Sequence, residues 1–257
     1  FRLTPPQYDT EFQNLSISSN EILKDSLFLA MKGGKSDGHL YIDSAFQQGC
    51  KGVIAERDSG FEKKKPILIF PDLQNNITQL SAFVYPKYLN VTNLLGVTGT
   101  NGKTTISSLI RYLLEKSGHE CGLMGTISCW DGKKLEVASH TTPPTTDIFR
   151  CLHQCAENNL DYCAMEVSSH ALKQNRLGEI KLKAGIFTNL TQDHLDYHQN
   201  MEDYEKSKLK LLNLIMDNGV IVVVDNEFGK KIVKVSMRKV LTVGKELGSD
   251  FLIKDIR

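Results

Sequence analysis

The sequence predicts an α/β protein with a small mixed α/β N-terminal domain and a larger central domain built on a mostly parallel sheet. Two observations support this fold class. From residue 94 onward, short apolar runs alternate with amphipathic stretches, as strands and helices do in a parallel sheet covered on both faces. A glycine-rich loop at 99–102 joins one such run to a helical pattern, which is typical of a phosphate-binding loop. We expect the domains at 1–88 and 89–257.

The N-terminal domain shows apolar runs of strand length and two helical patterns, separated by a glycine-rich loop and a charged patch. These features predict a small unit closed by an amphipathic helix. The expected strands are 26–31, 52–55 and 67–70, the loop is 33–38, and the helices are 42–48 and 77–85.

The central domain begins with a strand, the phosphate-binding loop and a helix with apolar residues at i, i+3, i+4, i+7 and i+8. Ligands of such open sheets bind at the carboxyl ends of the strands, so the loops after the strands are the candidate sites. The apolar helix positions are Ile106, Leu109, Ile110, Leu113 and Leu114. Strands are expected at 94–98, 121–127, 162–167, 185–188, 220–224 and 240–243, and helices at 106–117, 147–158, 201–216 and 227–235.

Composition narrows the class of protein. The 257 residues carry 31 lysines and arginines against 30 acidic residues, so bulk charge favours neither a nucleic-acid nor a membrane partner. We find no apolar run near the roughly 20 residues of a membrane span and no signal peptide, and we expect a cytoplasmic monomer. Because the chain opens on Phe1 and ends within a strand pattern, we expect a fragment.

The six cysteines are scattered through the chain, which predicts reduced thiols rather than disulfides. Cys151, His153 and Cys155 are spaced like metal ligands. They lie within a predicted helix, however, where both cysteines share one face. We therefore favour core packing over a metal site.

The loop Gly99-Thr100-Asn101-Gly102-Lys103-Thr104-Thr105 has the composition of a phosphate cradle. Glycines let backbone N–H groups turn toward an anion, and the following helix adds the positive end of its dipole. In such loops the lysine contacts the β- and γ-phosphates and the next hydroxyl ligates Mg²⁺. The spacing departs from G-x-x-x-x-G-K-[ST], because Val97 occupies the first glycine position. Nucleotide binding is still the favoured interpretation, since motif and context agree.

Polar clusters follow other predicted strands. The hydroxyls in 139–144 suit either a bound substrate or phosphate, or only the turn that starts the next helix. Glu166 closes a buried strand and is placed to hold Mg²⁺. Ser168, Gln174 and Arg176 would then offer donors to a carboxylate or phosphate. A serine hydrolase is excluded for want of a G-x-S-x-G turn.

His194 and His198 are four residues apart, a spacing that places two side chains on one helix face. The glutamate of the zinc motif H-E-x-x-H is missing, so a zinc hydrolase is disfavoured. A second Mg²⁺ site that uses His194 agrees better with the phosphate loop and Glu166.

Lys208 falls within the apolar stripe of its predicted helix, formed by Tyr204, Leu211, Leu212 and Ile215. An unpaired buried ammonium is costly, so the position needs an explanation. Helical geometry leaves three: the side chain reaches back to solvent, it pairs with an anion, or it is chemically modified.

Four motifs together resemble the Mur ligases, which build the peptide stem of peptidoglycan. The resemblance covers nearly the whole chain. The motifs are G-T-N-G-K-T-T at 99–105, T-T-P at 141–143, M-E-V-S-S-H at 165–170, and T-N-L-T-Q-D-H-L-D-Y-H at 188–198 followed by Y-E-K-S-K at 204–208.

The resemblance implies an ATP-dependent amide-forming ligase of peptidoglycan synthesis. The substrates it implies are UDP-N-acetylmuramoyl-L-alanyl-D-glutamate and a free third amino acid, meso-diaminopimelate or L-lysine. The glutamyl carboxylate would be phosphorylated by ATP, and the amino acid would attack the acyl phosphate. The amino acid would be selected by a C-terminal domain, which we expect to be missing here.

The resemblance also implies roles for individual residues. Gly99, Thr100, Asn101, Gly102, Lys103, Thr104 and Thr105 would bind ATP, while Thr104, Glu166, His194 and a carbamylated Lys208 would hold Mg²⁺. Lys103, Glu166, His194 and Lys208 form the implied catalytic set. Thr141, Thr142, Ser168, Gln174 and Arg176 would contact the dipeptide substrate. Ile17, Ser19, Gly34, Lys35 and Ser36 would contact the nucleotide of the UDP end.

One departure concerns this last group. The family usually has Asp-Ser-Arg where this chain has Ser18-Ser19-Asn20, so the resemblance implies the role of the domain but not the detail of its uridine contacts. Two alternatives remain open: another Mur ligase or a folylpolyglutamate synthetase, and a fragment that binds the UDP substrate without turnover.

Overall fold

The computed structural model describes residues 11–33, 36–58, 60, 65–91 and 93–254. Its contacts divide the chain into two compact units, Phe1–Pro86 and Lys87–Arg257.

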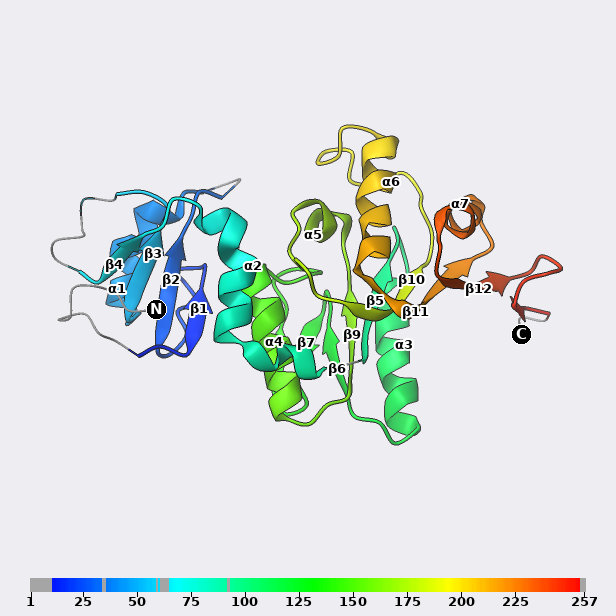
Figure 1. Ribbon diagram of the computed structural model, residues 1–257, viewed down its shortest axis with the longest axis horizontal. Helices are drawn as coiled ribbons and strands as arrows, with labels where there is room; N and C mark the ends of the chain where they lie inside the picture. Colours follow the sequence, from blue (N-terminus) through cyan, green and yellow to red (C-terminus); the bar gives the residue numbers. More distant parts are fainter. Residues whose placement is uncertain (1–10, 34–35, 59, 61–64, 92, 255–257) are drawn as a thin grey trace. The chain divides into compact units, whose positions relative to one another are not determined.

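The first unit is built on a fully parallel sheet in the order β1-β2-β3-β4 (Figure 1). All residues of β2 and β3 are buried, as expected of inner strands. The elements are β1 (Asn14–Ser16), β2 (Ser26–Ala30), α1 (Ile42–Gln47), β3 (Gly52–Ala55), β4 (Ile67–Ile69) and α2 (Leu73–Val84), with 3₁₀ helices at Gly38–Tyr41 and Pro86–Asn90.

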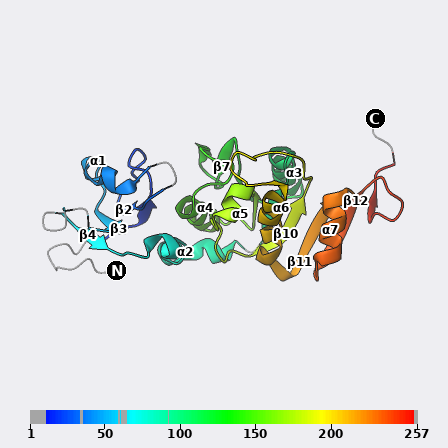
Figure 2. The ribbon, with the colours of Figure 1, turned by 90° about the horizontal axis from the view of Figure 1, so that it is seen from above.

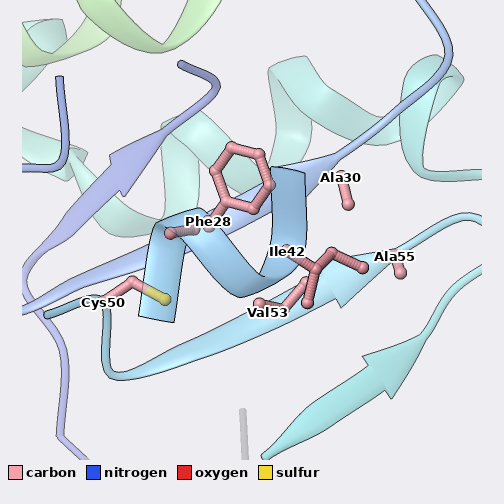
Figure 3. Close-up of a cluster of buried hydrophobic side chains, with 7 residues drawn as sticks. Phe28, Ala30, Ile42, Cys50, Val53 and Ala55 are labelled. Carbon is pink, nitrogen blue, oxygen red and sulfur yellow. The ribbon is translucent and has the colours of Figure 1, made fainter. Parts of the chain in front are cut away.

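The core of this unit lies between α1 and the inner strands. Phe28 and Val53 come from β2 and β3, and Ile42 comes from the first turn of α1. Figure 3 shows these side chains gathered around the helix. The core thus joins the helix to the two inner strands.

The second unit contains a sheet in the order β13-β12-β11-β10-β5-β9-β6-β7-β8. It is parallel from β13 to β6, and its strands β10, β11 and β12 follow one another toward the C-terminal end (Figure 2). The strands are β5 (Asn93–Thr98), β6 (Cys121–Met124), β7 (Ser128–Trp130), β8 (Leu135–Val137), β9 (Tyr162–Glu166), β10 (Leu182–Phe187), β11 (Ile215–Val224), β12 (Lys239–Gly244) and β13 (Phe251–Leu252). The helices are α3 (Lys103–Lys116), α4 (Thr145–Glu157), α5 (Ser169–Lys173), α6 (Met201–Leu209) and α7 (Glu227–Val235), with a 3₁₀ helix at Lys210–Leu214.

The α/β class and the mostly parallel sheet agree with the prediction from the sequence. The antiparallel pairs β6-β7 and β7-β8 were not predicted. Each of the two added strands is only three residues long, and neither is fully buried. Such short strands carry too little periodicity to be recognised.

The helix predicted at 201–216 is wrong in its second half. The α-helix ends at Leu209, and Ile215 already pairs with Leu182 of β10. Leu211 and Ile215 are buried in the observed arrangement as they would be on a helix. Buried residues four positions apart, such as Leu211 and Ile215, therefore could not distinguish a continuous helix from a helix followed by a strand.

The apolar stripe predicted on α3 is only partly buried. Ile106, Ile110 and Leu114 are half-buried, on the helix that contacts β5, β6 and β9. Leu109 and Leu113 are 50% and 53% exposed. Within the described residues, the sheet thus covers only one edge of the predicted stripe.

Candidate active site

The loops after three neighbouring strands meet at the carboxyl edge of the second sheet. In this sheet β5 lies between β9 and β10, and Val97 pairs with Glu166 while Thr98 pairs with Phe187. The phosphate loop follows β5, Ser168 follows β9, and the loop with His194 follows β10. Segments predicted separately from the sequence are therefore brought together by strand order.

The phosphate loop is fastened to the loop after β10. The Thr188 hydroxyl donates to the carbonyl oxygen of Asn101 at 2.6 Å. The backbone N–H of Asn101 donates to Asn189 Oδ1 at 2.9 Å, and that of Thr100 donates to the Asn189 carbonyl at 3.0 Å. Gly99 has a φ of +150°, and a Cβ there would lie 1.8 Å from Thr188 Oγ1. Only glycine fits this approach.

Two lysines converge on the start of the loop. Lys103 Nζ donates to the carbonyl oxygens of Gly99 and Thr100, at 2.9 and 2.8 Å. Lys208 Nζ, from α6, donates to the same Gly99 oxygen at 2.8 Å. Burial lowers the pKa of both lysines. For Lys208 the pKa is lowered to about 7, because the nearby Lys103 charge adds to burial while Asp193 opposes it only in part.

The inward position predicted for Lys208 is observed. Its side chain is 1% exposed, which excludes the explanation that it reaches back to solvent. No carboxylate of the described residues lies within ion-pair distance of its Nζ. An anion that enters the pocket, or a modification of the amine, remains as the explanation.

Glu166 is buried, and its carboxylate accepts three hydrogen bonds. Oε2 accepts from the Thr104 hydroxyl at 2.9 Å and from the Thr126 hydroxyl at 3.0 Å, and Oε1 accepts from the Thr126 backbone N–H at 2.8 Å. A Cβ on Gly125 would lie 2.3 Å from Oε1, so the carboxylate rests directly on the backbone. Thr126 did not stand out in the sequence, where a single threonine after a strand carries no signal.

The donor set at this point fits Mg²⁺. A carboxylate and a hydroxyl are oxygen ligands of the kind that the ion prefers, and they touch each other at the first turn of α3. Among the described residues, no three histidine, cysteine or acidic side chains are grouped tightly enough to hold a metal by themselves. Water or a phosphate would therefore have to supply the other ligands of Mg²⁺.

His194, in the loop after β10, has a left-handed backbone conformation with a φ of +54°. Its ring lies 5.0 Å from the ring of His170 and 6.0 Å from that of Tyr204. His170 in turn stacks on Tyr197 at 4.0 Å. Burial and the neighbouring histidines lower the pKa of His170. The ring of His194 is thus supported by aromatic contacts, and its Nε2 lies 3.6 Å from Asp193 Oδ2.

His198, the second histidine of that segment, is buried, and both of its ring nitrogens contact other side chains of the protein. Its Nε2 lies 2.9 Å from the Ser169 hydroxyl, and its Nδ1 lies 3.3 Å from Asp203 Oδ2. Lys173 also donates to Asp203 Oδ2, at 2.6 Å. This chain of contacts ties α5 to α6, which lie side by side in the fold (Figure 1). Sequence spacing could not reveal it, because the partners lie 29 residues apart.

These elements enclose a pocket of about 240 Å³. Seven of its lining residues belong to the candidate set taken from the sequence, while His140, Ser169 and His170 are additions. Three of the lining residues are lysines or arginines and none is acidic, which suits an anionic ligand. The lining residues are Lys103, His140, Thr141, Thr142, Ser168, Ser169, His170, Arg176, His194 and Lys208.

The predicted substrate residues at this pocket are linked to one another. Thr142 Oγ1 donates to the Glu166 carbonyl at 2.8 Å and accepts the backbone N–H of Ser168 at 2.9 Å. Arg176 donates to the Thr142 carbonyl at 2.7 Å and to Gln174 Oε1 at 2.8 Å. The hydroxyl of Thr142 is thus engaged by the protein, whereas the Thr141 hydroxyl accepts a hydrogen bond from the Thr126 hydroxyl, at 3.2 Å.

A second pocket, of about 400 Å³, belongs to the first unit. It lies where the loops leave β1 and β2, and Ile17, Ser19 and Ser36 of the candidate set line it. Gly34 and Lys35 of the same set lie outside the described residues. Other lining residues are Ser18, Asn20, Phe28, Leu29, Met31, Lys32, Gly33, Gly38, Tyr41 and Gln74.

All six cysteines are free. Cys151 and Cys155 are both buried in α4, where the hydrogen bond between the two thiols and then burial raise the pKa of Cys151. These positions agree with the preference for core packing. Among the described residues, no helix is long and apolar enough to cross a membrane.

Comparison with known proteins identifies the family. Residues 97–257 match the Mur ligase middle domain, and residues 11–83 match the catalytic domain of the Mur ligase family. The chain is 38% identical over 255 residues to the UDP-N-acetylmuramoyl-L-alanyl-D-glutamate–2,6-diaminopimelate ligase of Clostridioides difficile strain 630, covering 98% of this chain and 52% of the relative. The ligase of the same name from Syntrophomonas wolfei is 35% identical over 252 residues, covering 97% and 52%.

A solved structure of a UDP-N-acetylmuramoyl-L-alanyl-D-glutamate–2,6-diaminopimelate ligase has the same fold, with a TM-score of 0.73 and 26% identity over 95% of this chain and 51% of that one. The chain thus spans about half the length of the relatives that it matches. The resemblance carried by the four sequence motifs is confirmed, and the chain belongs to the Mur ligase family.

Proposed function

We propose that this chain carries the UDP-substrate site and the ATP site of a ligase that adds diaminopimelate to UDP-N-acetylmuramoyl-L-alanyl-D-glutamate. One observation carries the proposal: Lys103, Lys208, Arg176 and His194 line a single acid-free pocket beside the phosphate loop. A reaction between two anions, a nucleotide triphosphate and a carboxylate, requires cations at this position.

The ATP phosphates are bound by the loop from Gly99 to Thr105. Lys103 now donates to carbonyl oxygens of its own loop, so its ammonium is held where an incoming phosphate can replace those acceptors. Thr104 and Glu166 would hold Mg²⁺, which spreads the charge of the transferred phosphoryl group. The helix α3 directs its N-terminus at the same point.

The D-glutamyl carboxylate enters the neighbouring pocket. Arg176 is fixed by the Thr142 carbonyl and Gln174, so its guanidinium is oriented before substrate arrives. Thr141 and Ser168 offer hydroxyls on the same wall. A carboxylate held there lies beside Lys103, and it becomes an electrophile on phosphorylation. The relatives named as 2,6-diaminopimelate ligases support that amino acid as the attacking amine.

Lys208 is proposed to be carbamylated. A pKa of about 7 leaves much of the amine neutral at physiological pH, and only the neutral amine attacks CO₂. The nitrogen forms a bond to the CO₂ carbon and releases one proton, which gives a carbamate with two oxygens. The product replaces a buried cation by an anion between Lys103 and His194, where it can hold a second Mg²⁺.

Binding measurements test the proposal directly. The 257-residue chain should bind ATP, and Lys103→Ala should weaken ATP binding by about tenfold or more, because one ammonium on the phosphates is lost. It should also bind UDP-N-acetylmuramoyl-L-alanyl-D-glutamate more tightly than the analogue that lacks D-glutamate. Arg176→Gln should remove that preference and leave the analogue unaffected.

The matched control is Arg238→Gln, which removes a guanidinium that pairs with Asp217 away from both pockets. Equal affinity for the substrate and the shortened analogue in the unaltered chain would contradict the proposed carboxylate site. ATP binding that survives Lys103→Ala unchanged would contradict the proposed nucleotide site.

A further inference from the structure

We propose that Tyr197 is a positioning residue for the carboxylate site at Arg176: its hydroxyl fixes the amide of Gln174, and this amide orients the Arg176 guanidinium. The inference rests on the proposed function, since it requires that Arg176 binds the D-glutamyl carboxylate. Tyr197 lies in the loop after β10, within the motif at 188–198, and its side chain does not line the pocket of about 240 Å³.

Gln174 connects Tyr197 to Arg176. Its Nε2 donates to the Tyr197 hydroxyl at 3.1 Å, and its Oε1 accepts from Arg176 Nε at 2.8 Å. Gln174 does not line the pocket, whereas Arg176 does. A carboxamide has its donor and its acceptor at opposite ends, so both ends of this side chain are engaged by the protein. Gln174 therefore acts on a ligand through Arg176.

The contact with Tyr197 determines which end of the amide faces Arg176. A guanidinium has only donors, so it needs the amide oxygen as its partner. A reversed amide would turn its own NH₂ group toward those donors. The Tyr197 oxygen accepts from the amide nitrogen and thereby stabilises the orientation that Arg176 requires.

The ring of Tyr197 is itself held by neighbouring side chains. It stacks on His170 with ring centroids 4.0 Å apart, and it meets His198 edge-on at 5.0 Å. The Lys173 ammonium lies 5.3 Å from the ring centroid, and the same Nζ donates to Asp203 Oδ2 at 2.6 Å. His170 and Lys173 both belong to α5, so Tyr197 packs the loop after β10 against that helix. The position of the hydroxyl is thus set by these contacts.

The effect of this arrangement falls on the guanidinium of Arg176. A second contact, from Nη1 to the Thr142 carbonyl at 2.7 Å, leaves the N–H groups of Nη2 for a ligand. Among the described residues, no carboxylate lies within ion-pair distance of Arg176. Two fixed points orient the planar group, so less freedom is lost when a carboxylate binds. Without the Tyr197 hydroxyl, one of the two points loosens.

The first experiment compares two ligands by calorimetric titration of the whole chain: UDP-N-acetylmuramoyl-L-alanyl-D-glutamate and the analogue that lacks D-glutamate. Tyr197→Phe keeps the stacked ring and removes only the hydroxyl. It should weaken binding of the full substrate by about fivefold, as expected for the loss of one hydrogen bond, and change binding of the analogue by less than about twofold. The control is Tyr112→Phe, at an exposed tyrosine of α3 that does not line the pocket, and it should alter neither affinity.

A double-mutant cycle separates action through Gln174 from a general structural effect. Gln174→Leu removes both polar ends of the amide and should weaken binding of the full substrate at least as much as Tyr197→Phe does. Adding Tyr197→Phe to Gln174→Leu should cause no further loss, because the hydroxyl then has no amide to hold. A hydroxyl with a merely structural role would add its own loss to that of Gln174→Leu.

NMR spectroscopy measures the orientation of Arg176 without a ligand. The Nε–H that donates to Gln174 should give a ¹H–¹⁵N signal that is protected from exchange with water and is missing from Arg176→Gln. Tyr197→Phe should speed the exchange of this N–H several-fold, while its urea midpoint of unfolding stays close to that of the unaltered chain.

Additive losses in the cycle, or an unchanged preference for the full substrate in Tyr197→Phe, would overturn the role of Tyr197 and leave the carboxylate site in place. Equal losses for the two ligands would overturn it as well, because a hydroxyl that acts through Arg176 should not weaken a ligand without the D-glutamyl carboxylate. If the unaltered chain did not distinguish the two ligands, the proposed carboxylate site itself would fail, and the role of Tyr197 with it.

Discussion

Lys103 and Lys208 donate to one and the same acceptor, the carbonyl oxygen of Gly99, at 2.9 and 2.8 Å. The two lysines come from α3 and α6, which are separated by about a hundred residues of chain. Like charges so close to each other are unfavourable unless an anion lies near them. The relationship predicts that occupancy of the pocket by phosphate or carboxylate stabilises this part of the protein.

Gly99→Ala should disrupt the loop. The alanine methyl would collide with the Thr188 hydroxyl, and the +150° φ disfavours any side chain. We expect a loss of about 2 kcal/mol or more in the free energy of unfolding, measured by urea denaturation, together with loss of ATP binding. Gly118→Ala is the matched control, because Gly118 also has a positive φ but nothing lies within 4 Å of its Cβ. It should cost about 1 kcal/mol. Equal costs at both positions would contradict the clash.

Lys208→Met should change the pH dependence of stability. Between pH about 7 and 10.5 the folded chain binds fewer protons at Lys208 than the unfolded chain, so its contribution to stability rises with pH in this window. The free energy of unfolding of Lys208→Met should thus exceed that of the unaltered protein by the largest amount below pH 7. This difference should shrink as the pH rises toward 10.5. Denaturation in CO₂-free buffer measures this difference. The control is Lys210→Met, on an exposed side chain, which should show no such trend.

Addition of ¹³C-bicarbonate tests the carbamate itself. A carbamate carbon signal should appear in the NMR spectrum of the unaltered chain and be missing from Lys208→Met. The signal should grow as pH rises through about 7, because the neutral amine becomes more abundant. A signal of equal strength in both proteins would assign the carbamate to another amine.

Glu166→Gln should remove the effect of Mg²⁺ on nucleotide binding. The unaltered chain should bind a fluorescent ATP analogue more tightly with Mg²⁺ than with a chelator, since Thr104 and Glu166 lie ready to ligate the ion. The variant should bind with the weaker, metal-free affinity under both conditions. Glu157→Gln is the control, at a partly exposed carboxylate paired with Lys87. A retained Mg²⁺ effect in Glu166→Gln would refute the role of Glu166.

The cysteines should resist a thiol reagent until the chain unfolds. Burial raises the pKa of Cys50 and Cys121 to about 11 and that of Cys129 to about 12, and the thiolate is the reactive form. Cys129 is the one cysteine that is not fully buried, so access of the reagent should make it react first although the pKa of its thiol is also raised. All six should react in denaturant. Rapid labelling of several thiols in the native chain would contradict the buried positions.

The sequence was informative wherever one local pattern determined the structure. The phosphate loop was recognisable because strand, glycines, lysine and helix are contiguous, and the burial of Lys208 followed from helical spacing alone. The contacts of Thr126 with Glu166 span 40 residues, and those of Thr188 with Asn101 span 87. Such contacts depend on strand order, which no local pattern contains.

Prediction of secondary structure was also limited where a helix and a strand would bury the same residues of a segment. Ile215 is buried at the start of β11, as it would have been on the helix predicted at 201–216. A periodicity of burial cannot decide between them. The short strands β7 and β8 were missed because the pattern was too weak rather than ambiguous. Each has only three residues, none of them buried, and these show hardly any periodicity.

The fastening of the phosphate loop by Thr188 also constrains when the nucleotide site can form. During synthesis the loop emerges early, yet its partner at Thr188 emerges 87 residues after Asn101. Until then the carbonyl of Asn101 and the N–H groups of the loop lack the partners that shape them. The nascent chain thus contains the complete motif before Thr188 and Asn189 are present to hold the loop in the shape that it has in the folded chain.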